Sequence, residues 1–161
     1  MAQDKTQIKA TYPLPVYNYR VTVLQDGKPL ALSFAEISGL RQEYEAVTYK
    51  HGLSFVMGAK IIPGMVQPLR LTMKRGMAQN RAELQQWLQG VYSDPLRAGA
   101  KRDILVDLCD ESGKPLIRWT VQGALPVKLE APTFDAKSNE VAIETMELVA
   151  HALQVNYQPD V

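Results

Sequence analysis

The residues that could carry metal or thiol chemistry are few and far apart. The two histidines, His51 and His151, are about a hundred residues apart, and Cys109 is the only cysteine. Zinc sites use Cys and His ligands at short spacings, such as paired cysteines or a His-Glu-x-x-His helix. No such spacing occurs, so we expect no metal site. Since no histidine is near Cys109 in the sequence, we interpret this cysteine as structural and expect no disulfide.

A cluster of acidic residues is the next candidate for chemistry. Asp103 and Asp107 fall on the outward face of an alternating strand, which also carries Cys109, while Asp110 and Glu111 begin a turn. Paired catalytic carboxylates need a cleft and two different environments. We therefore interpret the cluster as a solvated acidic edge.

No phosphate-binding loop is present either. Gly113-Lys114 is followed by Pro115, lacks the Ser or Thr of a P-loop and does not lead into a predicted helix. We expect no cofactor and no enzymatic activity. A catalytic site built from residues distant in the sequence stays open.

Composition indicates one globular domain. The chain has 161 residues, of which 46% are hydrophobic, and 18 basic against 17 acidic residues leave a net charge of +1. This balance does not favour nucleic acid or anionic membranes as partners. We expect a single domain over residues 1–161, with a core of about 12–153 and loose termini at 1–11 and 156–161.

The first residues contain no apolar run, so we expect neither a secretory signal nor a membrane anchor. The longest apolar region, Leu53 to Val66, is broken by glycine, lysine and proline and is shorter than the roughly 20 residues of a membrane span. The lone cysteine fits a reducing compartment. These features predict synthesis in the cytoplasm.

Alternating apolar and polar residues predict about seven strands, most of them antiparallel. Asp26-Gly27 and Asp110 to Gly113 are turn signals between neighbouring strands. A glycine at Ser38-Gly39 suggests a bulge or kink. The strands are expected at 16–23, 31–49, 69–74, 104–108, 117–121, 125–129 and 140–153.

One helix is expected, at about residues 80–92. Asn80 can cap it, and Glu83 follows three residues later. Leu84, Trp87, Leu88 and Val91 lie on one face. A helix among so many strands predicts a mainly β fold, either a small β-barrel or a sandwich with one flanking helix.

Two segments depart from simple periodicity. In the last strand the apolar residues move from odd positions, at Val141 and Ile143, to even ones, at Met146 and Leu148, which suggests a bulge or burial on both faces. Residues 50–67 are apolar without a steady period and are interpreted as a long loop. This loop either packs on its own domain or stays exposed until a partner covers it.

Several landmarks, in order along residues 12–153, give the chain a resemblance to a known family. It resembles the tail tube proteins of contractile phages and contractile injection systems, which are similar in fold to the hemolysin-coregulated protein of type VI secretion. The landmarks are Tyr12-Pro13, Ser38-Gly39-Leu40, Tyr49 with Gly52, Pro63-Gly64, Leu69 to Gly76 with Lys74 and Arg75, Trp87, Trp119, Pro126-Val127, and Ser138-Asn139-Glu140 to Ile143.

The resemblance implies a structural function rather than catalysis. It implies hexameric rings of this chain that stack into a hollow inner tube, which a contractile sheath drives through a target envelope. The implied partners are further copies of the chain, the sheath protein, baseplate or tip proteins and tube-terminating proteins, with cargo or DNA in the lumen. It also implies assembly, after cytoplasmic synthesis, into a phage tail or an injection particle that can be released from the cell.

The resemblance further implies that the loop reaches the adjoining ring. Its expected contact residues are Tyr49, Lys50, His51, Gly52, Leu53, Phe55, Val56, Met57, Ile61, Ile62 and Met65. The loop is more apolar here than the polar, glycine-rich family version. That departure leaves open a low-copy initiator or adaptor at the baseplate or tip. In a different class, the chain could be a small β-barrel that binds an apolar ligand or hydrolyses a substrate, with residues 50–66 as its lid.

Overall fold

Ten strands and three helices make up the described part of the chain. The computed structural model describes residues 4–94, 96 and 100–159. The elements are α1 (Lys5–Thr11), β1 (Tyr19–Gln25), β2 (Lys28–Leu32), β3 (Glu36–Ser38), β4 (Tyr44–Tyr49), α2 (Ser54–Met57), β5 (Lys60–Val66), β6 (Leu69–Gly76), α3 (Glu83–Ser93), β7 (Arg102–Cys109), β8 (Pro115–Glu130), β9 (Ile143–Ala150) and β10 (Ala152–Asn156).

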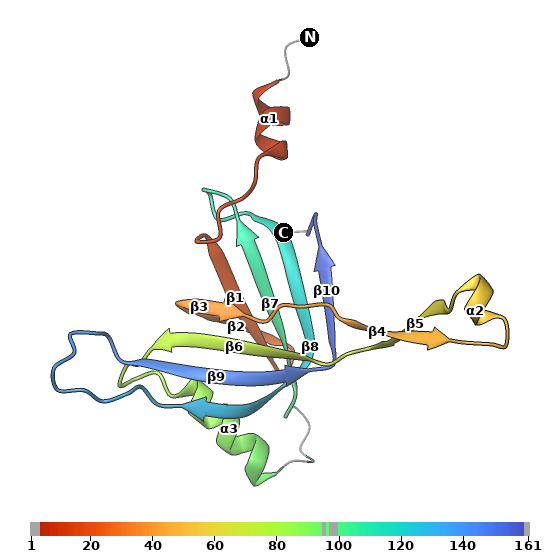
Figure 1. Cartoon of the computed structure of the whole chain (residues 1–161). Helices are drawn as coiled ribbons and strands as arrows, with labels where there is room; N and C mark the ends of the chain where they lie inside the picture. The colour runs from red at the N-terminus through yellow and green to blue at the C-terminus, as the bar shows by residue number, and fades with distance from the viewer. Residues whose placement is uncertain (1–3, 95, 97–99, 160–161) are drawn as a thin grey trace.

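Eight of the strands form one continuous, strongly bent sheet. Its order is β2-β1-β7-β8-β9-β6-β3, with β10 on the remaining edge of β8 and every pair antiparallel. Residues Arg118 to Gln122 of β8 lie between β7 and β10, and Leu125 to Glu130 pair with β9. In Figure 1, β1, β7 and β10 cross the direction of β6 and β9 instead of running alongside them. Since the described strand order ends at β2 and β3 without joining them, the fold is a sandwich rather than a closed barrel.

The bend of β8 is at Gly123. Its φ of +66° is rare for residues with side chains, and a Cβ there would lie 2.7 Å from the His151 ring. The Gly123 N–H donates a 2.9 Å hydrogen bond to Asp103 Oδ1, so it has a partner where the sheet turns. The two predicted strands at 117–121 and 125–129 are therefore one strand with a corner.

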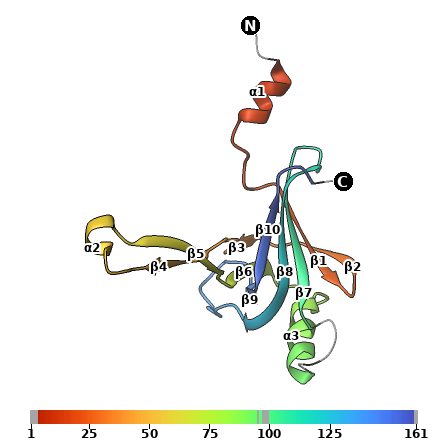
Figure 2. The ribbon, with the colours of Figure 1, turned by 90° about the vertical axis from the view of Figure 1, so that its right-hand side faces the viewer.

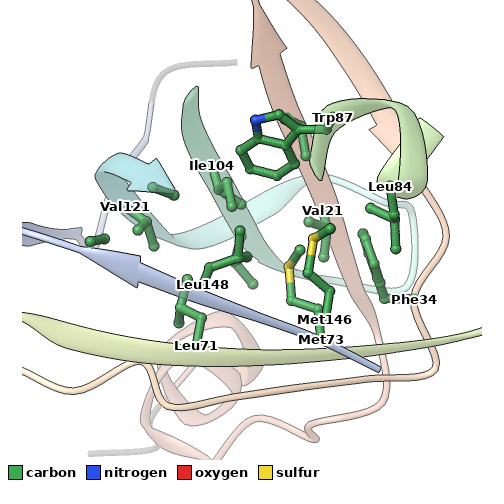
Figure 3. Packing of buried hydrophobic residues seen from close by; sticks show 14 of the residues in the cluster. Val21, Phe34, Leu71, Met73, Leu84, Trp87, Ile104, Val121, Met146 and Leu148 are labelled. Atoms are coloured by element: carbon green, nitrogen blue, oxygen red, sulfur yellow. The ribbon is translucent and has the colours of Figure 1, made fainter. Parts of the chain in front are cut away.

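The core lies between the two halves of the sheet and is closed by α3. Leu71, Met73, Met146 and Leu148 from one half face Val21, Ile104 and Val121 from the other (Figure 3). Leu84, Trp87 and Val91 of α3 are buried against this cluster, which confirms the predicted stripe. The Trp87 indole N–H donates to the Ala100 carbonyl at 3.0 Å.

The predicted helix boundaries need correction. The helix runs over Glu83–Ser93 instead of 80–92, its N-cap residue is Ala82, and no side chain caps it, so Asn80 does not have the predicted role. The N-terminal segment also differs, because α1 is helical where a loose terminus was expected. Residues 1–3, 160 and 161 of the predicted loose termini lie outside the described residues.

The strand between Ala31 and Tyr49 was predicted as one and is three. The expected interruption at Ser38-Gly39 is confirmed, because Gly39 follows β3 with φ +91°, next to the backbone of β6. A second break, which the sequence did not indicate, lies between the end of β2 at Leu32 and the start of β3 at Glu36. The Asp26-Gly27 turn between β1 and β2 and the hairpin between β7 and β8 are confirmed. The final predicted strand is divided at His151 into β9 and β10.

The prediction of an outward, solvated Asp107 and Cys109 is wrong. Both residues are buried, although Asp103 is exposed. Arg118 from β8 donates to Asp107 at 2.6 and 3.0 Å, and Arg20 from β1 lies at 3.4 Å from the same carboxylate. Alternation cannot reveal such burial, because the covering groups are long basic side chains of neighbouring strands.

The apparent change of phase in the last strand has a different cause from a bulge. The even positions of β9 are buried throughout, and the first of them is Glu144. Its carboxylate accepts a 2.6 Å hydrogen bond from Arg75, whose side chain is only 2% exposed. The apolar alternation of this strand therefore looked interrupted in the sequence because its first core position is occupied by a charged residue.

Candidate functional site

The longest unpartnered feature of the fold is a β-hairpin that leaves the body of the subunit. β4 and β5 pair only with each other in the described structure, and α2 lies in the connection at their tip. Both ribbon views show this hairpin arm, residues 44–66, extending away from the sandwich on the side opposite to β1 (Figure 1 and Figure 2). The predicted loop at 50–67 is therefore wrong in its conformation, because most of it is an ordered hairpin with a helical tip.

None of the hairpin arm is buried, although it is rich in apolar residues. Nearly half of the large apolar side chains that are exposed in the described structure lie on it. They include the predicted contact residues Tyr49, Leu53, Phe55, Val56, Met57, Ile61, Ile62 and Met65, with Tyr44, Val47 and Val66 in addition.

Both faces of the arm are apolar, which explains why its sequence shows no strand period. Val47 lies opposite Ile62 on one face, and Ile61 and Tyr44 lie on the other. A register shift between Tyr44 and Ala46 places an extra residue on β5 at Gly64, where a Cβ would be 2.6 Å from the Glu45 carbonyl oxygen. This close approach accounts for glycine at the Pro63-Gly64 landmark.

The tip of the arm is held by its own hydrogen bonds. The His51 backbone N–H donates to Ser54 Oγ at 2.7 Å, and His51 Nδ1 accepts from the Leu53 N–H at 3.2 Å. Gly58, with φ +80°, ends α2 and donates to the Ser54 carbonyl. This structure presents Phe55, Val56 and Met57 to solvent; Phe55 is 84% exposed.

An isolated two-stranded hairpin is at best marginally stable in water, and free strand edges invite pairing with other chains. The arm is joined to the body near its base, where Gln42 Nε2 donates to the Leu153 carbonyl at 3.0 Å. Large exposed apolar surfaces on proteins mark sites of contact with other proteins or membranes. The arm can therefore bind a macromolecular partner along most of its length.

A strand residue, Tyr19, and two landmark residues, Leu40 and Trp119, meet in an apolar cavity. Tyr19, Leu40 and Trp119, from three distant parts of the sequence, line a cavity of about 690 Å³ together with Phe34, Ile37, Val106 and Leu108. The Tyr19 hydroxyl donates to the Phe34 carbonyl at 2.7 Å. Burial, and secondarily the Glu36 carboxylate, raise the pKa of Tyr19, so this hydroxyl stays a donor. We call this cavity the apolar mouth.

A second group of landmark residues lines a more polar cavity of about 470 Å³. Lys74, Ser138 and Glu140 lie there with the exposed Phe134. Asn139 is exposed in the same loop between β8 and β9. The Ser138 backbone N–H donates a hydrogen bond to the Asp135 carbonyl, and Ser138 Oγ accepts one from the Glu140 backbone N–H. This landmark therefore forms a turn.

The other landmarks are structural in position. Trp87 packs in the core with the Arg102 guanidinium 4.8 Å from its ring centre. Arg75 joins β6 to Glu144 and to Glu83 at the start of α3, and Gly76 ends the strand. Ser38 and Gly39 end β3 against β6.

Sequence reasoning missed two exposed segments. Tyr12, Leu14, Val16 and Tyr17 form an apolar stretch between α1 and β1, and α1 contacts the body through a 3.0 Å ion pair between Lys9 and Glu111. Phe134 is 86% exposed on the loop before β9. For Tyr12 and Leu14 the signal was present, because both are large apolar residues next to proline and outside the predicted strands.

The described residues offer little for other classes of function. No three His, Cys, Asp or Glu side chains come together there as metal ligands. No helix in that part of the chain is long and apolar enough to cross a membrane. Burial raises the pKa of the Cys109 thiol, which disfavours its reactive thiolate form.

Comparisons with known proteins agree on one family. Residues 15–154 match the family model described as T4-like virus tail tube protein gp19. A chain in the PVC sheath-tube complex of an extracellular contractile injection system is 30% identical, with a TM-score of 0.81 over 97% of this chain and 99% of that chain.

Two further structures extend this result. A chain in the tube-terminating cap of the anti-feeding prophage is also 30% identical, with a TM-score of 0.78 over 91% of this chain and 93% of that one. Hcp1 from Flavobacterium johnsoniae shares the fold at 15% identity and a TM-score of 0.50, over 86% and 95% of the two chains. No curated protein sequence matches significantly.

Proposed function

The chain belongs to the T4-like virus tail tube protein family, and on that premise we propose that it is the repeating subunit of the inner tube of a contractile injection system. In this proposal the chain forms hexameric rings that stack into a hollow tube. The observation that carries it is the hairpin arm, which exposes apolar side chains on both faces and whose strands pair with no other strand among the described residues of the subunit.

The position of the arm, which extends away from its own sandwich, favours assembly with other copies. A protruding element that binds a different surface on the next copy makes a head-to-tail contact, which closes into a ring or continues as a filament. Rings that also contact one another along an axis form a tube. Burying one Phe or Ile side chain stabilises such a contact by about 1.5–3 kcal/mol. Several such residues on one arm suffice for firm stacking.

The partners follow from the same proposal. The similar chains occur in complexes described as a sheath-tube complex and a tube-terminating cap. We therefore expect this chain to contact further copies of itself, a sheath protein, and baseplate and terminating proteins at the tube ends. Cargo or DNA would pass through the lumen, and the finished particle can act outside the cell that made it.

A low-copy adaptor or terminator is the second candidate. Sequence identity favours this candidate as much as the first. The chain is 30% identical to a chain of the prophage cap and also 30% identical to the chain of the sheath-tube complex. A lid over an enzymatic cavity has less support, because no hairpin-arm residue lines any of four prominent cavities in the described part of the chain. The family is one of structural tube proteins.

Negative-stain electron microscopy over a concentration series, with light scattering on the same samples, tests this proposal. The tube subunit should give six-fold rings and stacks whose length grows with concentration. A protein that forms single rings but no stacks, even with tube ends added as seeds, would support the adaptor. A monomer that binds neither seeds nor other copies would contradict both.

A further inference from the structure

The apolar mouth is the part of the fold whose chemistry best matches the tip of the hairpin arm. Among its lining residues only Glu36 is charged, and the others include Ile37, Leu40, Val106 and Trp119. The tip residues Leu53, Phe55, Val56 and Met57 are exposed and uncharged. An apolar protrusion and an apolar cavity on the same molecule are the two halves of a head-to-tail contact.

The charges around the two surfaces are complementary. Residues 46–66 contain two lysines, Lys50 and Lys60, and no acidic residue. Glu36 at the mouth also pairs with Lys74 at 3.5 Å, on an exposed surface where such a pair contributes little. Glu36 therefore remains able to attract a basic segment that approaches the mouth.

The other cavities fit the tip less well. The cavity beside Lys74 is also lined by Glu130, Asp135 and Glu140, and the smallest one, of about 230 Å³, lies beside Arg20. The cavity beside α1 contains Lys9 and Asp110. Of these four cavities, the mouth is the one whose lining is apolar apart from a single charged residue, Glu36.

A subunit cannot fill its own mouth with its own tip. The mouth is lined from β1, β3, β7 and β8, whereas the arm extends on the side away from β1 in both ribbon views (Figure 1 and Figure 2). The hydrogen bonds of His51 and Ser54 hold the local conformation of the tip. The occupant must therefore come from another copy.

We propose that the apolar mouth is the receptor for the tip of the hairpin arm, residues 53–57, of a second copy of this chain. In this contact Phe55 enters the space next to Trp119 and Ile37, and the lysines of the arm lie near Glu36. The proposal rests on the proposed tube function and specifies which two surfaces meet.

Site-specific photo-crosslinking in assembled tubes tests it. Phe55 is replaced by p-benzoylphenylalanine, which keeps the aromatic ring, and tubes are formed from a mixture of isotope-labelled and unlabelled protein. After irradiation, mass spectrometry identifies crosslinks between differently labelled copies. The same analogue at Phe134, which is 86% exposed but lies outside the arm, is the matched control.

The expected result is crosslinks from position 55 to peptides containing Ile37 to Leu40, Val106 to Leu108 or Trp119, and none to these peptides from position 134. Tubes that form normally but crosslink position 55 elsewhere would overturn the proposal and leave the tube function intact. Wild-type protein that forms no rings or tubes would instead contradict the proposed function.

A second readout covers the case in which the Phe55 analogue does not assemble. Trp87 and Trp119 are the only tryptophans, so a Trp87→Phe variant reports on Trp119 alone. Trp119 is partly exposed in the free subunit. Covering of the mouth predicts a blue shift of its emission when tubes form. Unchanged emission in tubes confirmed by microscopy would contradict the proposal.

Discussion

Arg75 on β6 and Glu144 on β9 are direct cross-strand partners, and their side chains form a 2.6 Å ion pair on the core face of the sandwich. Arg75 continues the row of Leu69, Leu71 and Met73. Its guanidinium also donates to Glu83 at 3.1 Å and to the Arg81 carbonyl at 2.9 Å. This pair therefore closes the end of the core and fixes the start of α3.

Arg75→Ala should lower the free energy of unfolding by about 3–5 kcal/mol, because it leaves the buried Glu144 carboxylate without its cation. Urea unfolding followed by circular dichroism measures this change. Arg70→Ala is the matched control, since Arg70 is exposed on the same strand and its Glu147 partner is 3.9 Å away; its cost should stay below about 1 kcal/mol. Equal costs for the two variants would contradict the role given to Arg75.

Acid should weaken the subunit through Glu83. Its own backbone N–H, and then Arg75, hold the pKa of Glu83 below its ordinary value in the folded state. A lowered folded pKa gives stability that is present above the unfolded pKa and is lost as pH falls through the folded pKa. Unfolding free energies measured from pH 6 down to about pH 3 should therefore decrease, and Glu83→Gln should make the decrease smaller.

In Glu83→Gln the free energy of unfolding should still decrease at low pH, although by less than in the wild type. A hydrogen bond from the Ser112 hydroxyl is the main cause of a lowered pKa at Asp110. The pKa of Glu111 is lowered by a hydrogen bond from its own backbone N–H and then by one from Lys9. Both act in the same direction as Glu83. If the free energy of unfolding fell equally with pH in wild type and in Glu83→Gln, the folded state would not stabilise the charged form of Glu83.

Most of the fold could be predicted from local patterns, and the exceptions have specific physical causes. The strands near Val21, Leu71 and Val106 alternate because one face is buried, and the resemblance to tail tube proteins rested on such segments. The tail tube family predicted from that resemblance, with its structural role in a tube, is confirmed. The hexameric, stacked rings stay a proposal.

The errors arise where two or more distant segments decide the environment. Asp107 looked solvated because its two arginine partners come from β1 and β8. The hairpin arm looked irregular because apolar residues on both of its faces hide the period of two. The contact residues assigned to the arm stay a prediction until an assembled tube is examined.

Gly39 should be sensitive to any side chain. It has φ +91°, and a Cβ there would lie 2.0 Å from the Arg70 carbonyl oxygen of β6. Backbone strain in Gly39→Ala should reduce the free energy of unfolding by about 1–3 kcal/mol. Displacement of the β6 carbonyl should reduce it further. Gly52→Ala, where a Cβ meets nothing within 4 Å, should change it little. Thermal or urea unfolding of both variants gives the comparison.

The arm should be needed for assembly and not for folding. Phe55→Asp combined with Ile62→Asp places two carboxylates on surfaces that are exposed in the free subunit. We expect a wild-type circular dichroism spectrum and unfolding curve. Analytical ultracentrifugation should show loss of the large assemblies, since burying each apolar side chain stabilises the contact by about 1.5–3 kcal/mol and a carboxylate opposes it.

Met77→Asp is the control for a charge placed on an exposed apolar residue outside the arm. Met77 is 49% exposed, close to the 45% of Ile62. It should assemble like the wild type. Normal assemblies from the Phe55→Asp and Ile62→Asp double variant would remove the arm from the stacking contact.

The most direct test of the central claim is a cryo-electron microscopy map of tubes formed by the wild-type chain. We expect six copies in each ring, with residues 44–66 of every copy covered on both faces by neighbouring copies. A tube in which these residues lie free in solvent, or a particle that contains this chain without stacked rings, would contradict it.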